Sequence, residues 1–146
     1  MKRPNMEALT SGRLAKEADV NLETIRFYER EKLLPKPPRT AAGYRLFPAE
    51  AIQRVRFIRR AQTLGFTLKE IRELLALSQS RRASCETVRQ RAERKLVEIE
   101  GKITALVAMK GALTELSANC RGRGPVTRCP ILECLSSEKE IIHADR

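Results

Sequence analysis

The sequence predicts a mainly all-α protein: a small winged helix-turn-helix domain, a long helix that pairs antiparallel with a second copy, and a short C-terminal loop and helix. Two observations predict this fold. Residues 10–77 alternate short amphipathic helical segments with a proline-rich hairpin pattern. Residues 84–119 then contain no proline and keep a helical spacing of apolar side chains.

Positive charge is concentrated in the first half of the chain. The 146 residues carry a net charge of +11, with 32% charged and 4% aromatic residues. Residues 1–82 hold 18 Lys and Arg against 9 Asp and Glu, whereas residues 83–146 hold 11 against 9. A polyanion such as nucleic acid is therefore the expected partner of the first half. The chain has neither an apolar run of roughly 20 residues nor a signal-peptide core, so we expect a cytoplasmic protein that does not enter membranes.

The first predicted element is a helix-turn-helix over residues 10–34. Thr10 or Ser11 can cap its first helix, and an Asp-Val-Asn turn precedes the second. The second helix would lie in a DNA major groove, where Thr24, Arg26 and Tyr28 are of the right type to reach base edges or phosphates. Short helix pairs are common, so an ordinary helical hairpin is the alternative interpretation.

A hairpin predicted over residues 35–48 supports the first interpretation. Pro35, Pro37 and Pro38 exclude a continuing helix, and Gly43 supplies a turn before a short return strand. A hairpin directly after a helix-turn-helix forms a wing. Arg39, Tyr44 and Arg45 are then suited to contact the phosphate backbone.

Two further helices follow the wing. The first begins near Pro48 and ends near Leu64, and it carries four arginines spread around its surface. We expect some of them to contact phosphate and others only water. A capping box over Thr67–Glu70 begins the next helix. We therefore place the DNA-binding domain at residues 8–77 and a polar linker at residues 78–84.

The helix predicted over residues 85–119 is expected to form a dimer. Its apolar residues follow coiled-coil spacing with one local slip: Leu96, Ile99, Ile103 and Leu106, then Met109, Leu113 and Leu116. A lone helix of this length is marginal in water, so the apolar stripe needs a partner. The alternative, packing on its own domain, leaves too little chain to cover the stripe. A metal-binding loop and short helix are expected over residues 120–135, and a polar tail over residues 136–146.

Cys85, Cys120 and Cys129 form a candidate thiol site. The 35 helical positions from Cys85 to Cys120 span roughly 50 Å, too far for one metal ion to bridge within one chain. An antiparallel helix pair would bring Cys85 of one chain to Cys120 and Cys129 of the other. Cys85 and Cys129 both stand at predicted helix starts, where free N–H groups favour the thiolate. Such a site selects soft metals, and Cys134 either completes a tetrahedron or fills an apolar face.

These segments resemble the MerR family of transcriptional regulators over about residues 9–135. The resemblance lies in TSGRLAKEADVNLETIRFYEREKLL, AAGYRLF, RRAQTLGFTLKEIRELL and the final long helix. The cysteine pattern is similar to that of mercury-responsive members. It implies that Cys85, Cys120 and Cys129 bind Hg(II), one ion per site shared between two subunits. It also implies a homodimer on double-stranded promoter DNA that recruits RNA polymerase, represses without metal, and activates by distorting the DNA when metal is bound.

Two alternatives use the same fold. A sensor of cadmium, lead or zinc would bind a different thiophilic ion at these cysteines, although copper(I) sensors of the family carry serine where this chain has Cys85. A thiol redox regulator would instead oxidise the same thiolates. An enzyme is not expected, because no histidine stands beside the cysteines as a base, and His143, the only histidine, lies in the tail.

Overall fold

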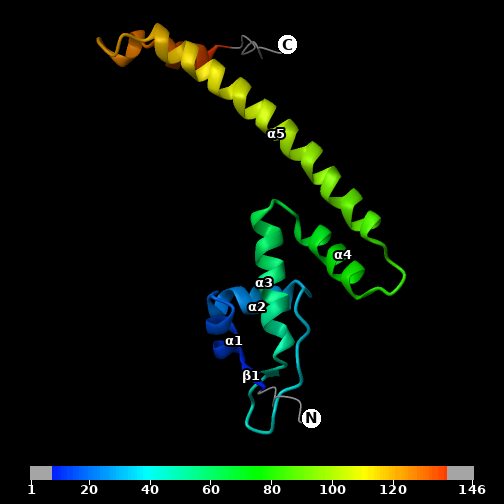
Figure 1. The fold of residues 1–146 in the computed structure, drawn as a ribbon. Coiled ribbons are helices and arrows are strands. Elements are labelled where there is room, and N and C mark those ends of the chain that lie inside the picture. Colours follow the sequence, from blue (N-terminus) through cyan, green and yellow to red (C-terminus); the bar gives the residue numbers. More distant parts are fainter. Residues whose placement is uncertain (1–7, 138–146) are drawn as a thin grey trace. The chain divides into compact units, whose positions relative to one another are not determined.

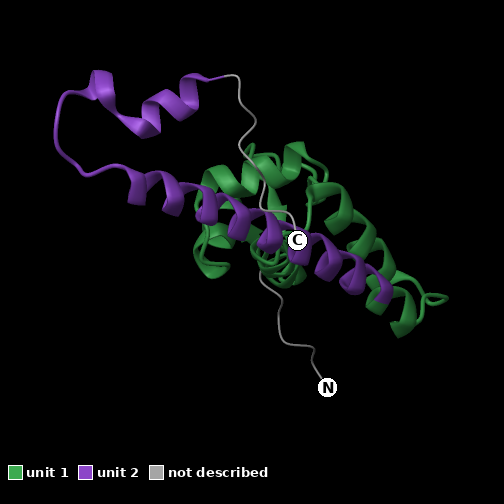
Figure 2. Ribbon diagram, turned by 90° about the horizontal axis from the view of Figure 1, so that it is seen from above, with its two compact units in different colours: residues 1–89 green, residues 90–146 purple. Residues whose placement is uncertain are grey.

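The structure is a computed structural model, and it describes residues 8–137. It comprises two compact units, the first ending at Arg89 and the second beginning at Gln90 (Figure 2). This boundary falls inside the long helix. The linker expected at residues 78–84 overlaps the segment between the helix that ends at Gln79 and the helix that begins at Cys85. Most of the expected polar tail, with His143, lies outside the described residues.

The predicted helix-turn-helix is present as α1 (Ser11–Glu17) and α2 (Leu22–Arg30) (Figure 1). The side-chain oxygens of Thr10 and Asn21 accept the backbone N–H three residues further on, at 3.2 and 2.8 Å, and so cap the two helices. Asp19, between them, has a φ of +57°. The two helices pack against each other through small, apolar faces. The buried residues there are Leu14, Ala15, Ala18 and Ile25.

The wing is closed by a small antiparallel sheet. Arg39 and Arg45 form a β-bridge across the predicted hairpin, which confirms it. The return strand continues into β2 (Leu46–Phe47), which pairs with β1 (Leu9–Thr10) rather than with the wing. The sequence did not predict β1, because two residues carry no measurable alternation of apolar and polar side chains. The sheet thus joins the wing to the start of the domain.

Two helices complete the first unit, α3 (Glu50–Thr63) and α4 (Leu68–Gln79). Both hydrogen bonds of the predicted capping box are formed: the N–H of Thr67 donates to Glu70 Oε1 at 2.9 Å, and the N–H of Glu70 donates to Thr67 Oγ1 at 3.2 Å. The apolar faces of these helices close the core over α1 and α2. The largest fully buried side chains are Tyr28, Phe47, Leu14, Ile25, Leu33, Leu34, Ile58, Ile71 and Val55.

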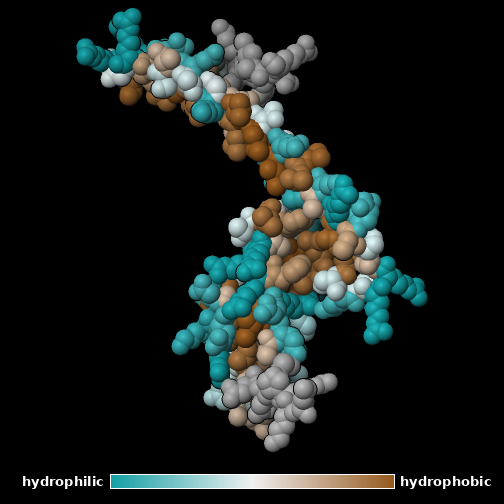
Figure 3. All heavy atoms as spheres, viewed as in Figure 1, coloured by the Kyte–Doolittle hydropathy of each residue, from teal (hydrophilic) through white to brown (hydrophobic). Residues whose placement is uncertain are grey.

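The long helix α5 runs over Cys85–Asn119, and Ser84 lies in capping position before it. Apolar side chains along α5 are exposed to solvent (Figure 3). The most exposed large ones are Leu96, Val97, Ile103, Leu106, Val107, Met109 and Leu113, each with more than half of its surface accessible. Apolar area left in water is unfavourable by about 25 cal/mol per Å². The helix therefore presents a surface suited to a partner.

A loop after α5 reverses the chain and leads through the 3-10 turn η1 (Val126–Arg128) into α6 (Pro130–Ser136) (Figure 2). Pro130 occupies the first position of α6, where its missing N–H is not needed. Ile131 and Cys134 are half-buried, whereas Leu132 and Leu135 are exposed. Across the described residues, no helix combines the length and apolarity that a membrane span requires.

Candidate nucleic-acid interface and thiol site

The solvent face of α2 carries two arginines. Arg26 and Arg30 lie four residues apart, on one side of the helix, and both are exposed. Arg26 also pairs with Glu23 at 3.3 Å, and 58% and 73% of these two side chains are accessible. Thr24 is half-buried, and its hydroxyl donates to Asn21 Oδ1 at 2.8 Å. The sequence singled out Arg26 and Thr24 but missed Arg30, which the same helical spacing could have indicated.

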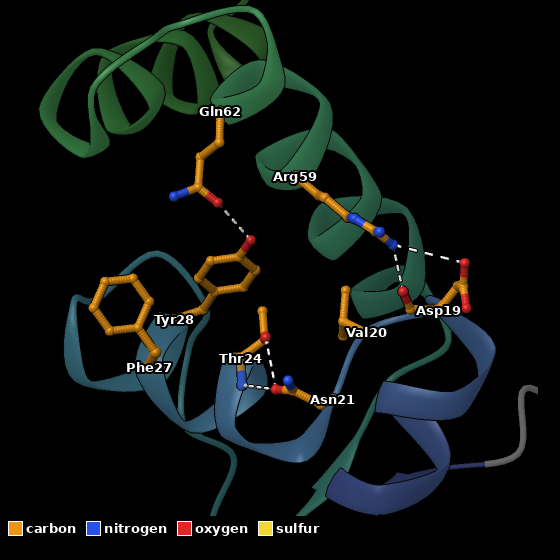
Figure 4. A pocket seen from close by; sticks show the side chains of 8 residues that line it. All are labelled: Asp19, Val20, Asn21, Thr24, Phe27, Tyr28, Arg59 and Gln62. Atoms are coloured by element: carbon orange, nitrogen blue, oxygen red, sulfur yellow. Dashed lines mark hydrogen bonds and ion pairs between the residues drawn. The ribbon is translucent and has the colours of Figure 1, made fainter. Parts of the chain in front are cut away.

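Tyr28 is a core residue, which corrects the base-contacting role expected from its type. Only 2% of its surface is exposed, and its hydroxyl donates to Gln62 Oε1 at 2.7 Å (Figure 4). Burial raises the pKa of the phenol, and the charge of Arg59 partly opposes that rise. The hydrogen bond of Tyr28 therefore attaches α2 to α3, and we do not assign Tyr28 to DNA contact.

The three wing residues expected to contact phosphate divide into two groups. Tyr44 has 64% of its surface exposed, and Arg39 is exposed beside it, with one weak contact of 3.4 Å to the carbonyl oxygen of Gly43. Arg45 instead points to the carboxylate of Glu29 on α2, at 2.5 Å. Its side chain is only 25% exposed. The wing thus presents Arg39 and Tyr44 to solvent and holds Arg45 against the domain.

Three of the arginines on α3 bind main-chain carbonyl groups of the helix-turn-helix. Arg54 Nε donates to the carbonyl of Leu33 at 2.6 Å, and Arg56 Nη2 donates to that of Glu17, the last residue of α1, at 2.9 Å. Arg59 donates to the carbonyl of Asp19 in the turn (Figure 4). A cation at a helix C-terminus is favoured by the helix dipole. These arginines were expected to meet phosphate or water, and the structure uses them to hold α1, the turn and the segment after α2.

Cys120 and Cys129 lie together at the far end of α5. Cys120 directly follows the last helical residue, and Cys129 is the N-cap of α6. The backbone N–H of Leu132, aided by that of Ile131 and by the side chain of Cys120, holds the pKa of the Cys129 thiol below its ordinary value. Partial burial and the charge of Glu133 act against this shift. Two sulfurs at one helix start are a donor set suited to a soft metal ion.

Cys85 is the exposed first residue of α5, 35 positions before Cys120. The structure therefore brings together two of the three predicted thiols in one chain and leaves the third at the other end of the helix. Among the described residues of one chain, no three His, Cys, Asp or Glu side chains are grouped so as to hold a metal. Cys134 is half-buried on α6, as a small apolar filler would be.

The helix-turn-helix, the wing and the basic exposed face define a DNA-binding regulator. Comparison with known proteins agrees. The family described as "MerR HTH family regulatory protein" matches residues 9–78, and the one described as "MerR, DNA binding" matches residues 52–116. The chain therefore belongs to the MerR family of helix-turn-helix transcriptional regulators, and it is not an enzyme.

Relatives and solved structures of this family match nearly the full length. The "Mercuric resistance operon regulatory protein" of Serratia marcescens is 43% identical, covering 97% of this chain and 96% of that protein. The "HTH-type transcriptional regulator ZntR" of Escherichia coli strain K12 is 37% identical, covering 85% and 89%. The crystal structure of PbrR691 from Ralstonia metallidurans CH34 in complex with lead(II) has a TM-score of 0.77 and 35% identity, covering 88% and 99%.

Proposed function

We propose that the protein is a mercury(II)-responsive transcriptional regulator. It binds promoter DNA as a homodimer, represses without metal, and activates by distorting the DNA when Hg(II) is bound. The observation that carries the proposal is the thiol pair of Cys120 and Cys129 at the start of α6. Thiolates select soft ions, and no histidine or carboxylate joins these two sulfurs in a metal-binding group within the described residues.

Cys85 of a second protomer is the third ligand in this proposal. A helix of 35 residues is about 50 Å long, so Cys85 cannot meet Cys120 along its own helix. Antiparallel pairing of two α5 helices would place Cys85 of one protomer beside Cys120 and Cys129 of the other. The exposed apolar residues of α5 support such pairing. Each site would then hold one Hg(II) shared between two subunits.

The DNA contacts are assigned to residues of the first unit that solvent reaches. On α2 these are the half-buried Thr24 and the exposed Arg26, to which we add the exposed Arg30; in the wing they are the exposed Arg39 and Tyr44. Arginines at such positions contact phosphate or guanine.

RNA polymerase is the second macromolecular partner, because a regulator that activates by deforming promoter DNA acts on polymerase already recruited there. With these two partners, the protein would act in the cytoplasm.

Another thiophilic ion is the main alternative. A relative named ZntR and a structure solved with lead(II) belong to the same family, but both are less similar to this chain than the mercuric resistance regulator. Zinc usually takes four ligands, and the Cys120 and Cys129 pair with Cys85 supplies three. A transcription assay against Hg(II), Cd(II), Pb(II), Zn(II) and Cu(I) separates these ions. A response to zinc at lower concentration than to mercury would exclude the mercury proposal, and a response to peroxide without metal would favour a redox regulator.

The shared site is tested by mixing two defective variants. Cys85→Ser and Cys120→Ser homodimers should each bind Hg(II) far more weakly than the unmodified protein in a competition assay with a thiol chelator. Heterodimers formed from the two variants should regain one tight site, because one protomer keeps Cys85 and the other keeps Cys120 and Cys129. Cys134→Ser is the control and should bind normally. Full binding by each variant homodimer would show that the site is not shared between subunits.

A further inference from the structure

Glu29 is a buried acid on the helix that enters the DNA groove. It is 6% exposed, and its Oε2 accepts a hydrogen bond from Arg45 Nη1 at 2.5 Å. A buried carboxylate without a partner is strongly unfavourable, so removing this arginine would leave an uncompensated charge in the domain. The side chain of Arg45 is also mostly covered, at 25% exposed. The pair is therefore a tertiary contact, unlike the exposed ion pair of Arg26 and Glu23 on the same helix.

Arg45 lies where the wing meets the sheet. It forms the β-bridge with Arg39 on one side and is followed directly by β2 on the other. Beyond it, the N–H of Thr40 donates to the carbonyl of Tyr44 at 2.7 Å, so the hairpin is hydrogen-bonded as one piece. A contact made by Arg45 therefore sets the position of the whole wing. Its partner Glu29 is one residue from the end of α2.

We propose that Arg45 and Glu29 are positioning residues that hold the wing at a fixed distance and angle from α2, so that both engage one DNA half-site together. Arg45 acts through Glu29 and does not contact phosphate. The phosphate contacts of the wing come from Arg39 and Tyr44, which are exposed. If Arg45 turned to DNA, the buried carboxylate of Glu29 would lose its partner, and that cost opposes the exchange.

The inference rests on DNA binding alone and is tested without metal, so its outcome is independent of the mercury proposal. The probe is an operator duplex selected from a random-sequence DNA pool with the unmodified full-length protein. Glu29→Gln is the decisive variant, because it keeps the size of the side chain and removes one negative charge. Charge alone predicts tighter DNA binding by this variant. Positioning predicts weaker binding, by about tenfold, because the wing is no longer held.

The salt dependence of affinity separates positioning from phosphate contact. Each lost phosphate contact lowers the slope of log K against log[salt] by about 0.9, so a substitution present in both protomers lowers it by about 1.8. We expect Arg39→Ala to show this change. Arg45→Ala, Glu29→Gln and the double variant should all weaken binding to a similar extent and keep the slope of the unmodified protein. A reduced slope for Arg45→Ala, together with unchanged or tighter binding by Glu29→Gln, would overturn the proposal.

Hydroxyl-radical footprinting provides a readout that lower stability would not produce. The positions that lose protection with Arg39→Ala identify the backbone contacts of the wing. Arg45→Ala and Glu29→Gln should lose protection at the same positions and retain it where α2 binds. Uniform loss of protection across the half-site would mean that these residues only stabilise the fold. If Arg45→Ala fails to fold, Glu29→Gln alone decides. Positioning predicts weaker DNA binding by this variant, whereas the charge change alone predicts tighter binding.

Discussion

Arg72 on α4 donates two hydrogen bonds to the backbone carbonyl of Glu31, the C-cap residue directly after α2, from Nε at 3.0 Å and from Nη2 at 2.6 Å. The same Nη2 lies 3.3 Å from the carboxylate of Glu31. A guanidinium at a helix C-terminus also interacts favourably with the helix dipole. The last helix before α5 is thereby attached to the end of the helix that carries Arg26 and Arg30, the two arginines proposed to contact DNA.

We expect Arg72→Ala to lower the free energy of unfolding by about 1 kcal/mol and to weaken operator binding, because the end of α2 loses its hydrogen bonds to α4. The ion pair itself should contribute little, since both side chains are about 40% exposed. Urea denaturation followed by circular dichroism, at equal protein concentrations, measures the change. Lys69→Ala removes an exposed cation from the same helix and is the matched control. If both variants lose the same unfolding free energy and operator affinity, the effect comes from the lost positive charge alone.

The phenol of Tyr28 should ionise at higher pH than an ordinary tyrosine. Burial raises its pKa above the ordinary value of about 10, and the charge of Arg59 reduces that rise. Tyr28 and Tyr44 are the only tyrosines and there is no tryptophan, so the phenolate absorbance of the unmodified protein minus that of Tyr28→Phe follows Tyr28 alone. We expect the midpoint of this difference above pH 10. A midpoint at or below 10 would contradict the burial argument.

The same shift affects stability. The unfolded chain loses the Tyr28 proton at lower pH than the folded protein does, so the stabilisation is fully present below about pH 10 and is lost as the pH rises through the folded pKa. The difference in unfolding free energy between the unmodified protein and Tyr28→Phe should therefore shrink above pH 10. At neutral pH the variant should be less stable by about 1 kcal/mol, because the hydrogen bond to Gln62 is absent.

The features that could be predicted from the sequence are those set by residues close together along the chain. Caps at Thr10, Asn21 and Thr67 depend on residues within one turn, so the sequence specifies them directly. The roles of Arg54 and Arg45 depend instead on groups 21 and 16 residues away, which only the fold brings near. The composition and local pattern of a basic domain are the same whether an arginine contacts phosphate, a carbonyl oxygen or a buried acid. Sequence therefore predicted a basic surface but not which of its cations are committed to the core.

The same argument applies to the thiols. The caps at Ser84 and Cys129 are local, and they place Cys85 and Cys129 at helix starts as predicted. The proximity of Cys120 and Cys129 follows from a loop of only eight residues between them. Whether Cys85 joins them depends on a second chain, which neither the periodicity of α5 nor the structure of one protomer contains. The shared site therefore stays a prediction that binding experiments must test.

Two glycine-to-alanine substitutions should shift stability in opposite directions. Gly43, in the turn of the wing, has a φ of +87°, and an added Cβ meets no atom within 4 Å, so only backbone strain opposes the change. Gly43→Ala should cost about 1 to 2 kcal/mol. Gly101 lies inside α5 with equally free space, and Gly101→Ala should stabilise the helix by about 0.5 to 1 kcal/mol. Thermal melting measures both. A shift of the same sign in the two variants would contradict the conformational explanation.

Dimerisation through the apolar stripe of α5 is tested by placing one charge on it. Leu106 is 61% exposed, and Leu106→Glu would bury an unpaired carboxylate if this face contacts a second α5. Thr104 lies on roughly the opposite side of the helix, and its hydroxyl bonds only to the carbonyl of Glu100 in the preceding turn, at 3.1 Å. We expect Leu106→Glu to sediment as a monomer at concentrations where the unmodified protein and Thr104→Glu sediment as dimers. It should also lose tight operator binding, since the two half-sites are then no longer bound by linked domains. A dimer that survives Leu106→Glu but not Thr104→Glu would place the interface on the other side of α5.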